Sequence, residues 1–284
     1  MIDTHLHLWE LSRGWYGWNT PVLGPVHDDS TIDDVADAMA ASRVDTVIAV
    51  QAADSVAETE WLLGLADRHP NIRGVVAYLP VDDFSATERA LMRYSDRALV
   101  GCRQLWHNHH RSDELAGPDT LRSLGLLGDA GLSVDIPDAF PRLWPALTVA
   151  VTRLPGTRFV LDHCGKPPFG DPSLWPAWEA AFTDLARRPN VFTKLSGLFG
   201  GSGSAHPATE LELARVVHLT RTAAGAERTM VGSDWPMTRG RVDYPTTVAR
   251  LEDLLSPWTE DERQTTLGET ARTAYELTDN RSCH

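Results

Sequence analysis

The sequence contains very little lysine and cysteine and no long apolar run. Lys166 and Lys194 are its only lysines among 26 basic residues, and the three cysteines, Cys102, Cys164 and Cys283, show no CxxC spacing. Such cysteines fit a reducing compartment and argue against a disulfide framework or a cysteine zinc site. No run approaches the roughly 20 apolar residues that cross a bilayer, and the polar N-terminal motif leaves no room for a signal peptide. We therefore expect a cytoplasmic location.

Acidic residues outnumber basic residues by 39 to 26, so the net charge at pH 7 is −13. An acidic protein of this kind is not expected to bind nucleic acid or an anionic membrane. Hydrophobic residues make up 42% and charged residues 23%, which is typical of a globular protein with a sizeable core. No internal repeat or low-complexity linker divides the 284 residues, so we predict one domain over 1–284 and leave homo-oligomerisation open.

Apolar, β-rich runs alternate with amphipathic helical patterns along the chain. Strands are expected over Ile2–His7, Thr46–Gln51, Ile72–Leu79, Leu99–Trp106, Leu132–Ile136, Thr157–Asp162, Val191–Leu195 and Thr229–Ser233. Helices are expected over Ile32–Ser42, Val56–His69, Thr87–Ser95, Asp119–Asp129, Arg142–Val151, Pro176–Arg187, Glu210–Ala223, Tyr244–Leu255 and Glu260–Leu277. Eight such units predict a parallel α/β sheet closed into a (β/α)8 TIM barrel with an extra C-terminal helix. No GxGxxG motif follows the first strand, which weakens a dinucleotide-binding interpretation.

The first expected strand carries the pattern His5-Leu6-His7. Because side chains alternate along a strand, the two imidazoles project to the same side and can bind one divalent cation. A pair of strand histidines can also be purely structural. A position at the C-terminal end of a barrel strand, where TIM-barrel active sites lie, favours the metal.

Two further polar residues end later strands. His163 follows the sixth apolar run and precedes a Gly and a Pro, so it is a candidate third ligand, although it could simply cap the barrel. Asp234 follows the eighth strand, which adjoins the first strand in a closed barrel. Its carboxylate could bind a metal, take a proton from water, or do both. The alternative is a structural Asp that starts a turn.

Positive charges cluster at the same predicted strand ends. Lys166 and Lys194 each come after an apolar run, and Arg103 follows the fourth. In an acidic protein, three such cations on one face suit an oxyanion or a substrate carboxylate. Ordinary salt bridges are the alternative for each.

Aromatic residues and histidines fill the neighbouring loops. Trp9, Trp106 and Trp235 each lie close to a predicted site residue and could wall a ring such as a sugar lactone. Tyr16 crowds the first βα loop with Trp15 and Trp18, and we expect these two tryptophans to pack that loop against the barrel. The irregular spacing of His107, His109 and His110 favours exposed or substrate-edge residues over a second metal cluster.

Together these segments resemble the amidohydrolase superfamily, in particular the amidohydrolase-2 branch that contains sugar-lactone and pyrone-dicarboxylate lactonases. The matching segments, from residue 3 to residue 236, are DTHLHLW, GCRQLW, FVLDHCGKP, KLSG and GSDWP. The resemblance implies that His5, His7, His163 and Asp234 hold one divalent cation, expected to be Zn²⁺, and activate water, with Asp234 as general base. Some lactonases of this branch work without a metal, so metal-free catalysis stays open.

The resemblance also implies roles for the cations. Arg103 matches an arginine directed at a substrate carbonyl or carboxylate, and Lys166 falls where relatives place a cation near a substrate oxygen. Lys194 does likewise or pairs with a neighbouring strand end. The fourth and fifth strands offer Arg103-Gln104 and Asp135-Ile136-Pro137 in place of a bridging carboxylated lysine, which argues against a binuclear centre.

These features predict a metal-assisted hydrolase of the lactonase type, acting on a small-molecule lactone or carboxylated ring. A sugar-acid lactone, as in rhamnono- or fucono-lactonases, is the expected substrate. One alternative is a zinc-dependent nonoxidative decarboxylase of an aromatic or unsaturated acid on the same barrel. A catalytically silent binding protein is the other.

Overall fold

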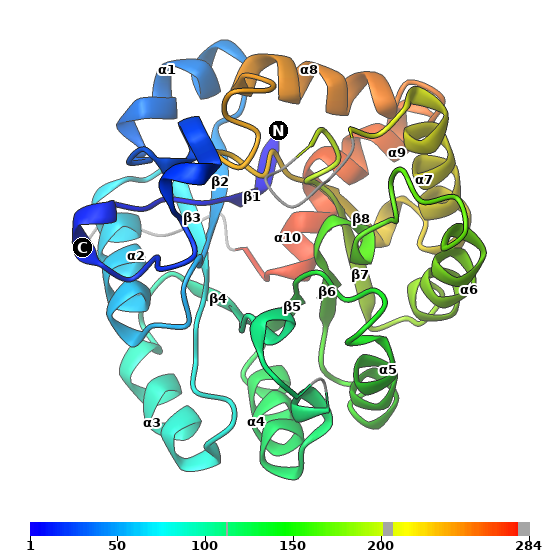
Figure 1. The fold of residues 1–284 in the computed structure, drawn as a ribbon. Coiled ribbons are helices and arrows are strands. Elements are labelled where there is room, and N and C mark those ends of the chain that lie inside the picture. The colour runs from blue at the N-terminus through cyan, green and yellow to red at the C-terminus, as the bar shows by residue number, and fades with distance from the viewer. Residues whose placement is uncertain (112, 201–206, 278–284) are drawn as a thin grey trace.

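The computed structural model describes residues 1–111, 113–200 and 207–277, and within them eight parallel strands form one sheet in sequence order (Figure 1). The strands are β1 (Ile2–Leu6), β2 (Thr46–Val50), β3 (Ile72–Ala77), β4 (Leu99–Arg103), β5 (Ser133–Ile136), β6 (Phe159–Leu161), β7 (Val191–Leu195) and β8 (Thr229–Val231). Backbone hydrogen bonds from Asp234 N to His5 O (2.8 Å) and from His7 N to Trp235 O (2.7 Å) join the end of β8 to β1. The predicted (β/α)8 barrel is thereby confirmed.

Helices surround the barrel (Figure 1). They are α1 (Asp33–Ala41), α2 (Val56–Arg68), α3 (Phe84–Tyr94), α4 (Pro118–Asp129), α5 (Trp144–Arg153), α6 (Trp175–Ala186), α7 (Glu210–Ala223) and α8 (Tyr244–Leu254). At the start of α1, Thr31 N donates to Asp34 Oδ2 (2.7 Å) and Asp34 N donates to Thr31 Oγ1 (3.4 Å), which is the reciprocal pattern of a capping box. None of the helices in the described ranges has the length and apolarity needed to span a membrane.

The strands divide the core into two layers, because alternate side chains point inward and outward. Val47 and Ala49 of β2 pack outward against the helices, whereas Ile48 and Val50 join the cluster inside the barrel. A branched apolar interior of this kind is how TIM barrels fill their centre.

The last expected helix, Glu260–Leu277, has a more elaborate form. It consists of α9 (Glu260–Gln264), a π-helical turn (Thr265–Glu269) and α10 (Thr270–Ala274). Ala271, Ala274 and Tyr275 belong to the interior cluster of the barrel. Figure 1 accordingly shows α10 against the strands and not in the outer ring of helices. The C-terminal segment therefore contributes to the inside of the barrel.

Several strands are shorter than the apolar pattern predicts. β1, β4, β6 and β8 end at Leu6, Arg103, Leu161 and Val231. Beyond β6 the backbone turns at once, with positive φ at His163 (54°), Cys164 (52°) and Lys166 (68°). Positive φ is rare for residues other than glycine and costs conformational energy, and it is concentrated at functional sites. The polar residues that follow these strands thus leave the sheet and face the loops at its C-terminal end.

Candidate active site

The junction of β1 and β8 positions three polar side chains. Its anchor is the fully buried Asp3, whose Oδ1 accepts hydrogen bonds from His5 N (3.1 Å) and Ser233 N (2.8 Å). Tyr244 Oη donates to the other oxygen (3.0 Å). Gly232 allows the close approach of the two strands, because a Cβ there would lie 2.5 Å from His5 Cβ. Asp234, with φ of 59°, then turns toward the histidines.

His5, His7 and Asp234 converge on one point. The Nε2 atoms of the two histidines are 3.2 Å apart, and Asp234 Oδ1 lies 3.7 Å from Nε2 of His5 and 3.6 Å from Nε2 of His7. His7 Nδ1 lies 2.8 Å from the carbonyl oxygen of Val50, so it donates its proton there and leaves a lone pair on Nε2. The predicted HxH pair and the strand-eight carboxylate are therefore brought together.

This trio fits a divalent cation. Bonds of about 2.1 Å at tetrahedral angles separate neighbouring ligand atoms by about 3.4 Å, close to the separations found here. Asp234 Oδ1 is buried and has no hydrogen-bond partner. Burial lowers the pKa of His7 and lowers that of His5 well below its usual value, so both rings are neutral. Neutral imidazoles and an unpartnered carboxylate oxygen are the donor set that zinc prefers.

His163 approaches Asp234 from another side. Its Nε2 lies 3.9 Å from Asp234 Oδ1, and its Nδ1 lies 2.8 Å from Ser196 Oγ. Among the described residues, the group whose ligand atoms all lie within 4.8 Å of one another is His5, His7 and Asp234, without His163. Gly197 makes room for this ring, since a Cβ there would lie 2.6 Å from His163 Nδ1. The structure thus places His163 beside the carboxylate, and a ligand role for it does not follow from the geometry.

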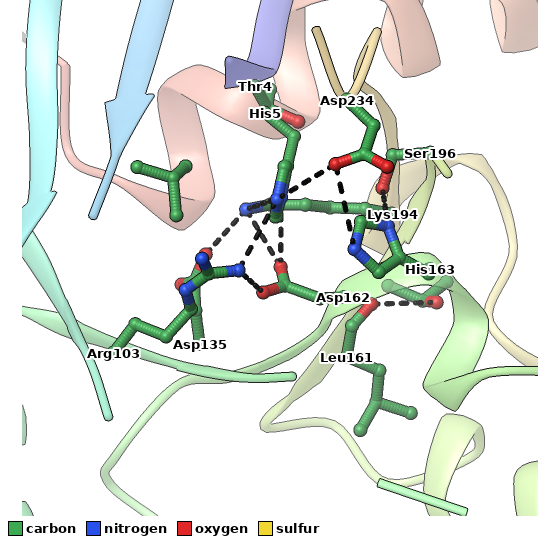
Figure 2. Close-up of polar contacts among 12 residues, drawn as sticks. Thr4, His5, Arg103, Asp135, Leu161, Asp162, His163, Lys194, Ser196 and Asp234 are labelled. Atoms are coloured by element: carbon green, nitrogen blue, oxygen red, sulfur yellow. Dashed lines mark hydrogen bonds and ion pairs between the residues drawn. The ribbon is translucent and has the colours of Figure 1, made fainter. Parts of the chain in front are cut away.

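A network of buried charges lies beneath the histidines (Figure 2). Asp162 Oδ1 is 3.2 Å from His5 Nδ1 and 3.0 Å from Lys194 Nζ, and its Oδ2 accepts a hydrogen bond from Arg103 Nη1 (3.1 Å). Lys194 Nζ also contacts Asp135 Oδ2 at 2.5 Å. Two carboxylates and two cations thus balance each other, as buried charges require.

The pKa values of the two carboxyls respond in opposite directions. Burial alone would raise the pKa of Asp162, but Lys194 and His5 hold it well below its usual range. Burial raises the pKa of Asp135 to about 6, against the opposing effect of Lys194. Asp162, which faces His5, is therefore the carboxyl of the two that gives up its proton more readily.

A cavity of about 360 Å³ opens above the trio at the C-terminal ends of the strands. Its polar lining includes His7, Arg103, His107, Asn108, Asp138, His163, Lys166 and Asp234, and its apolar lining includes Trp18, Leu105, Phe140, Phe169, Leu198 and Met237. This volume and this mixture of apolar walls and few polar groups suit a small ring-shaped ligand.

The three cations that were predicted to contact the substrate do not all lie at the cavity. Arg103 and Lys166 line the cavity, as expected. Lys194 does not line it and is fully buried. Its expected contact with substrate is at odds with this position, because β7 directs the side chain into the barrel, where the two carboxylates hold it. The structure instead shows the alternative predicted for Lys194, a pairing with residues of neighbouring strand ends, here Asp135 and Asp162.

The predicted aromatic wall is built from other residues. Trp9, Trp106 and Trp235 are buried and do not line the cavity. The loops fold these indoles inward, and Trp9 Nε1 donates to Asp28 O (2.8 Å). Trp18 lines the cavity although its expected role was packing, and Phe140 and Phe169 complete the aromatic lining.

The three loop histidines do not form a second cation site within the described residues. His109 lies between Glu114 (2.7 Å) and Asp54 (3.4 Å), and His110 is exposed. His107 lines the cavity, and burial lowers its pKa to about 4. Of the three, His107 is the one that lines the cavity.

Sequence reasoning missed Asp162, Asp135 and Asp138. A signal was present for two of them, because Asp135 interrupts an apolar strand and Asp162 directly precedes His163. Asp138 Oδ2 lies 2.5 Å from Lys166 Nζ, and its φ is 45°. That pairing joins the loops after β5 and β6, so no local pattern indicates it.

Comparisons with known protein families, sequences and structures agree with one another. The profile of the amidohydrolase family matches residues 2–277. An L-fucono-1,5-lactonase from Burkholderia ambifaria is 32% identical over 245 residues, which cover 84% of this chain and 81% of that protein. An L-fucono-1,5-lactonase from Burkholderia multivorans is 28% identical, with 97% and 96% covered. A crystal structure of an amidohydrolase from Burkholderia multivorans with bound zinc superposes with a TM-score of 0.88 at 27% identity, covering 98% of this chain and 99% of that one.

Proposed function

The chain belongs to the amidohydrolase family, and from this premise we propose that it is a lactonase that hydrolyses the cyclic ester of an uncharged sugar-acid lactone. The observation that carries the proposal is the unpartnered, buried Oδ1 of Asp234 at the floor of the cavity. A carboxylate in that position can accept the proton of a water molecule that attacks a bound carbonyl carbon.

In the proposed reaction, Asp234 takes a proton from water while the water oxygen attacks the lactone carbonyl. The ring C–O bond then breaks, and the same proton passes to the leaving alkoxide, so that lactone and water give a hydroxy acid. His163, whose Nε2 lies 3.9 Å from Asp234 Oδ1, helps to orient the carboxylate. Arg103 lies at the cavity floor and stabilises negative charge that develops on the carbonyl oxygen.

A zinc ion fits the trio of His5, His7 and Asp234, which resembles the donor sets of zinc enzymes. When bound, such an ion polarises a carbonyl and lowers the pKa of water. The tautomer of His7, set by the carbonyl of Val50, keeps a nitrogen lone pair available for it.

The pairing of the cations favours an uncharged substrate over a carboxylated ring. Among the lysines and arginines of the described residues, only Arg103 and Lys166 line the cavity. Each is neutralised by a carboxylate, Arg103 by Asp162 and Lys166 by Asp138. A substrate carboxylate would meet no unpaired cation there and would lie near Asp234 and Asp138. The hydroxyl groups of a sugar lactone instead match the hydrogen-bonding groups of His107, Asn108 and Lys166.

The test is a panel assay with a pH indicator, corrected for the spontaneous hydrolysis of each lactone. We expect acid release from neutral aldonolactones, such as L-fucono-1,5-lactone, and much slower release from a pyrone dicarboxylate. Failure to open any neutral lactone, together with carbon dioxide release from a hydroxybenzoate, would overturn the proposal and support the decarboxylase alternative.

A further inference from the structure

Three consecutive loops bring polar side chains to the cavity. His107 comes from the loop after β4, Asp138 from the loop after β5 and Lys166 from the loop after β6, and all three line the cavity. These strands are neighbours in the sheet, so we call the three residues the polar wall. The proposed reaction gives none of them a chemical step, which leaves their role in the cavity to be explained.

Hydrogen bonds tie the loops of the polar wall to one another. Phe140 N donates to Gly165 O (3.0 Å), which joins the loop after β5 to the loop after β6. Arg142 donates to Trp106 O (2.7 Å) and to His109 O (2.8 Å), which joins the loop after β4 to the loop after β5. Groups that are held in a fixed arrangement lose less entropy when a ligand binds. The three loops therefore present one preorganised surface to a ligand.

Asp138 and Lys166 both have a left-handed backbone, with φ of 45° and 68°. For residues other than glycine this conformation costs energy, and it is concentrated at functional sites. Asp138 Oδ2 lies 2.5 Å from Lys166 Nζ, and 26% and 42% of the two side chains are exposed. An ion pair with this exposure adds little to stability. Stabilisation of the fold therefore does not account for the two strained residues, whereas contact with a ligand does.

The Asp138–Lys166 pair keeps hydrogen-bonding capacity for a ligand. The ammonium group has three donors, and Asp138 Oδ2 is the acceptor that it contacts among the described residues. In the same part of the chain, Asp138 Oδ1 has no hydrogen-bond partner. A ligand hydroxyl both donates and accepts, so it satisfies the free carboxylate oxygen and a free N–H together. A ligand carboxylate only accepts and is repelled by Asp138, and a methylene group satisfies neither atom.

We propose that Asp138 determines the substrate specificity of this site. Its Oδ1 accepts a hydrogen bond from a hydroxyl group of the lactone ring, and its charge, by neutralising Lys166, excludes rings that carry a carboxylate. The inference rests on the proposed function for the reaction that is catalysed. The exclusion of carboxylates is a property of the cavity that a binding measurement detects without turnover.

The variant that tests this role is Asp138→Asn. Asparagine has nearly the same shape as aspartate and, like it, adopts positive φ more readily than most residues, so the backbone at this position is kept. The change removes the negative charge and replaces one acceptor oxygen by a donor. Asp171→Asn is the matched control, because Asp171 lies in the loop after β6, is exposed and does not line the cavity. Thermal unfolding of both variants checks that they are folded.

The first readout is selectivity between two neutral lactones, L-fucono-1,5-lactone and δ-valerolactone, which has the same six-membered ring without hydroxyl groups. We expect the ratio of their kcat/KM values to fall about tenfold in Asp138→Asn, as for the loss of one hydrogen bond to a charged group. The control should keep the wild-type ratio. An unchanged ratio in Asp138→Asn, whether or not both activities fall, would show a purely structural role and overturn the inference.

The second readout is the binding of 2-pyrone-4,6-dicarboxylate, measured by calorimetry. We expect Asp138→Asn to bind it about tenfold more tightly than the wild type, because Lys166 is then free to pair with a ligand carboxylate. The gain should be absent in the double variant Asp138→Asn/Lys166→Met. Equal affinities in Asp138→Asn and the wild type would contradict the exclusion of carboxylates. If the wild type opens no lactone, the proposed function is wrong, and the binding comparison by itself decides this role of Asp138.

Discussion

The two lysines of this protein lie on opposite sides of the same site and have different surroundings. Lys166 lies on the cavity wall, with 42% of its side chain exposed, and pairs with Asp138. Lys194 is completely buried below the histidines, between Asp135 and Asp162. Lys194 belongs to β7 and points inward, whereas Lys166 lies in the turn beyond β6. The comparison teaches that Lys194, which points into the barrel from its strand, holds the buried charges together, whereas Lys166, in a βα loop, lines the cavity.

The largest effect on stability is expected from Lys194→Met. The change leaves two carboxylates, Asp135 and Asp162, adjacent in the barrel without their shared cation. Removing one partner of a buried ion pair costs about 3–5 kcal/mol, and we expect a loss of that size in the unfolding free energy from urea denaturation. A loss below about 1 kcal/mol would mean that the network is hydrated or otherwise compensated.

Gly197→Ala should disturb the part of the site that faces the cavity, with a smaller loss of stability than Lys194→Met. Gly197 has φ of 63°, and a Cβ there would lie 2.6 Å from His163 Nδ1 and 3.1 Å from Asp234 Oδ2. The left-handed backbone costs about 1–2 kcal/mol for a residue with a side chain, and the displaced His163 should lower kcat. Gly14→Ala is the matched control, because Gly14 has φ of 73° with nothing within 4 Å of the added Cβ. Equal kcat values in the two variants would contradict this geometry.

His107 should make stability depend on pH in a defined window. Burial lowers its pKa to about 4, whereas the unfolded value is near 6.5. Between these values only the unfolded chain binds the proton, so the unfolding free energy should fall as pH drops from about 6.5 to about 4. One proton contributes at most about 1.4 kcal/mol per pH unit.

In His107→Asn this contribution should vanish, so the slope in that window should be smaller, with no difference in slope above pH 7. Chemical denaturation at a series of pH values measures the slope. A difference that is confined to alkaline pH would show that another group is responsible.

Lys166→Met should have the smallest effect on stability. A half-exposed ion pair is worth about 0–1 kcal/mol, so the unfolding free energy should change by no more than that. Because Lys166 lines the cavity, we expect KM for a neutral lactone to rise while kcat is largely kept. If Lys166→Met destabilised the fold as much as Lys194→Met, the proposed difference between the two lysines would be contradicted.

Much of the fold could be predicted because its signals are local. Apolar runs such as Val47–Val50 and Val191–Leu195 show strand character without any knowledge of their neighbours, and all eight strands lie within the expected ranges. The meeting of His5, His7 and Asp234 also follows from the sequence, because the first and last strands of a closed barrel are adjacent. The inward direction of Lys194 could have been derived from the alternation along its strand.

The remaining features depend on long-range packing. Whether Trp9 or Trp18 faces the cavity depends on how the first loop folds over the barrel, which residue spacing does not encode. The pairing of Lys166 with Asp138 joins two loops that are 28 residues apart in sequence. The contact of Tyr275 with Asp135 spans 140 residues and depends on the path of the C-terminal segment. Sequence patterns reveal the residue types at such sites but not their partners.

The most direct test of the central claim is the hydrolysis of a neutral aldonolactone by Asp234→Asn, with Asp37→Asn, at an exposed carboxylate on α1, as the control. We predict that kcat falls by about a thousandfold in Asp234→Asn, within the range for loss of a general base. The melting temperature should stay close to that of the wild type, and Asp37→Asn should retain full activity. Lactone opening at the wild-type rate by folded Asp234→Asn would contradict the account.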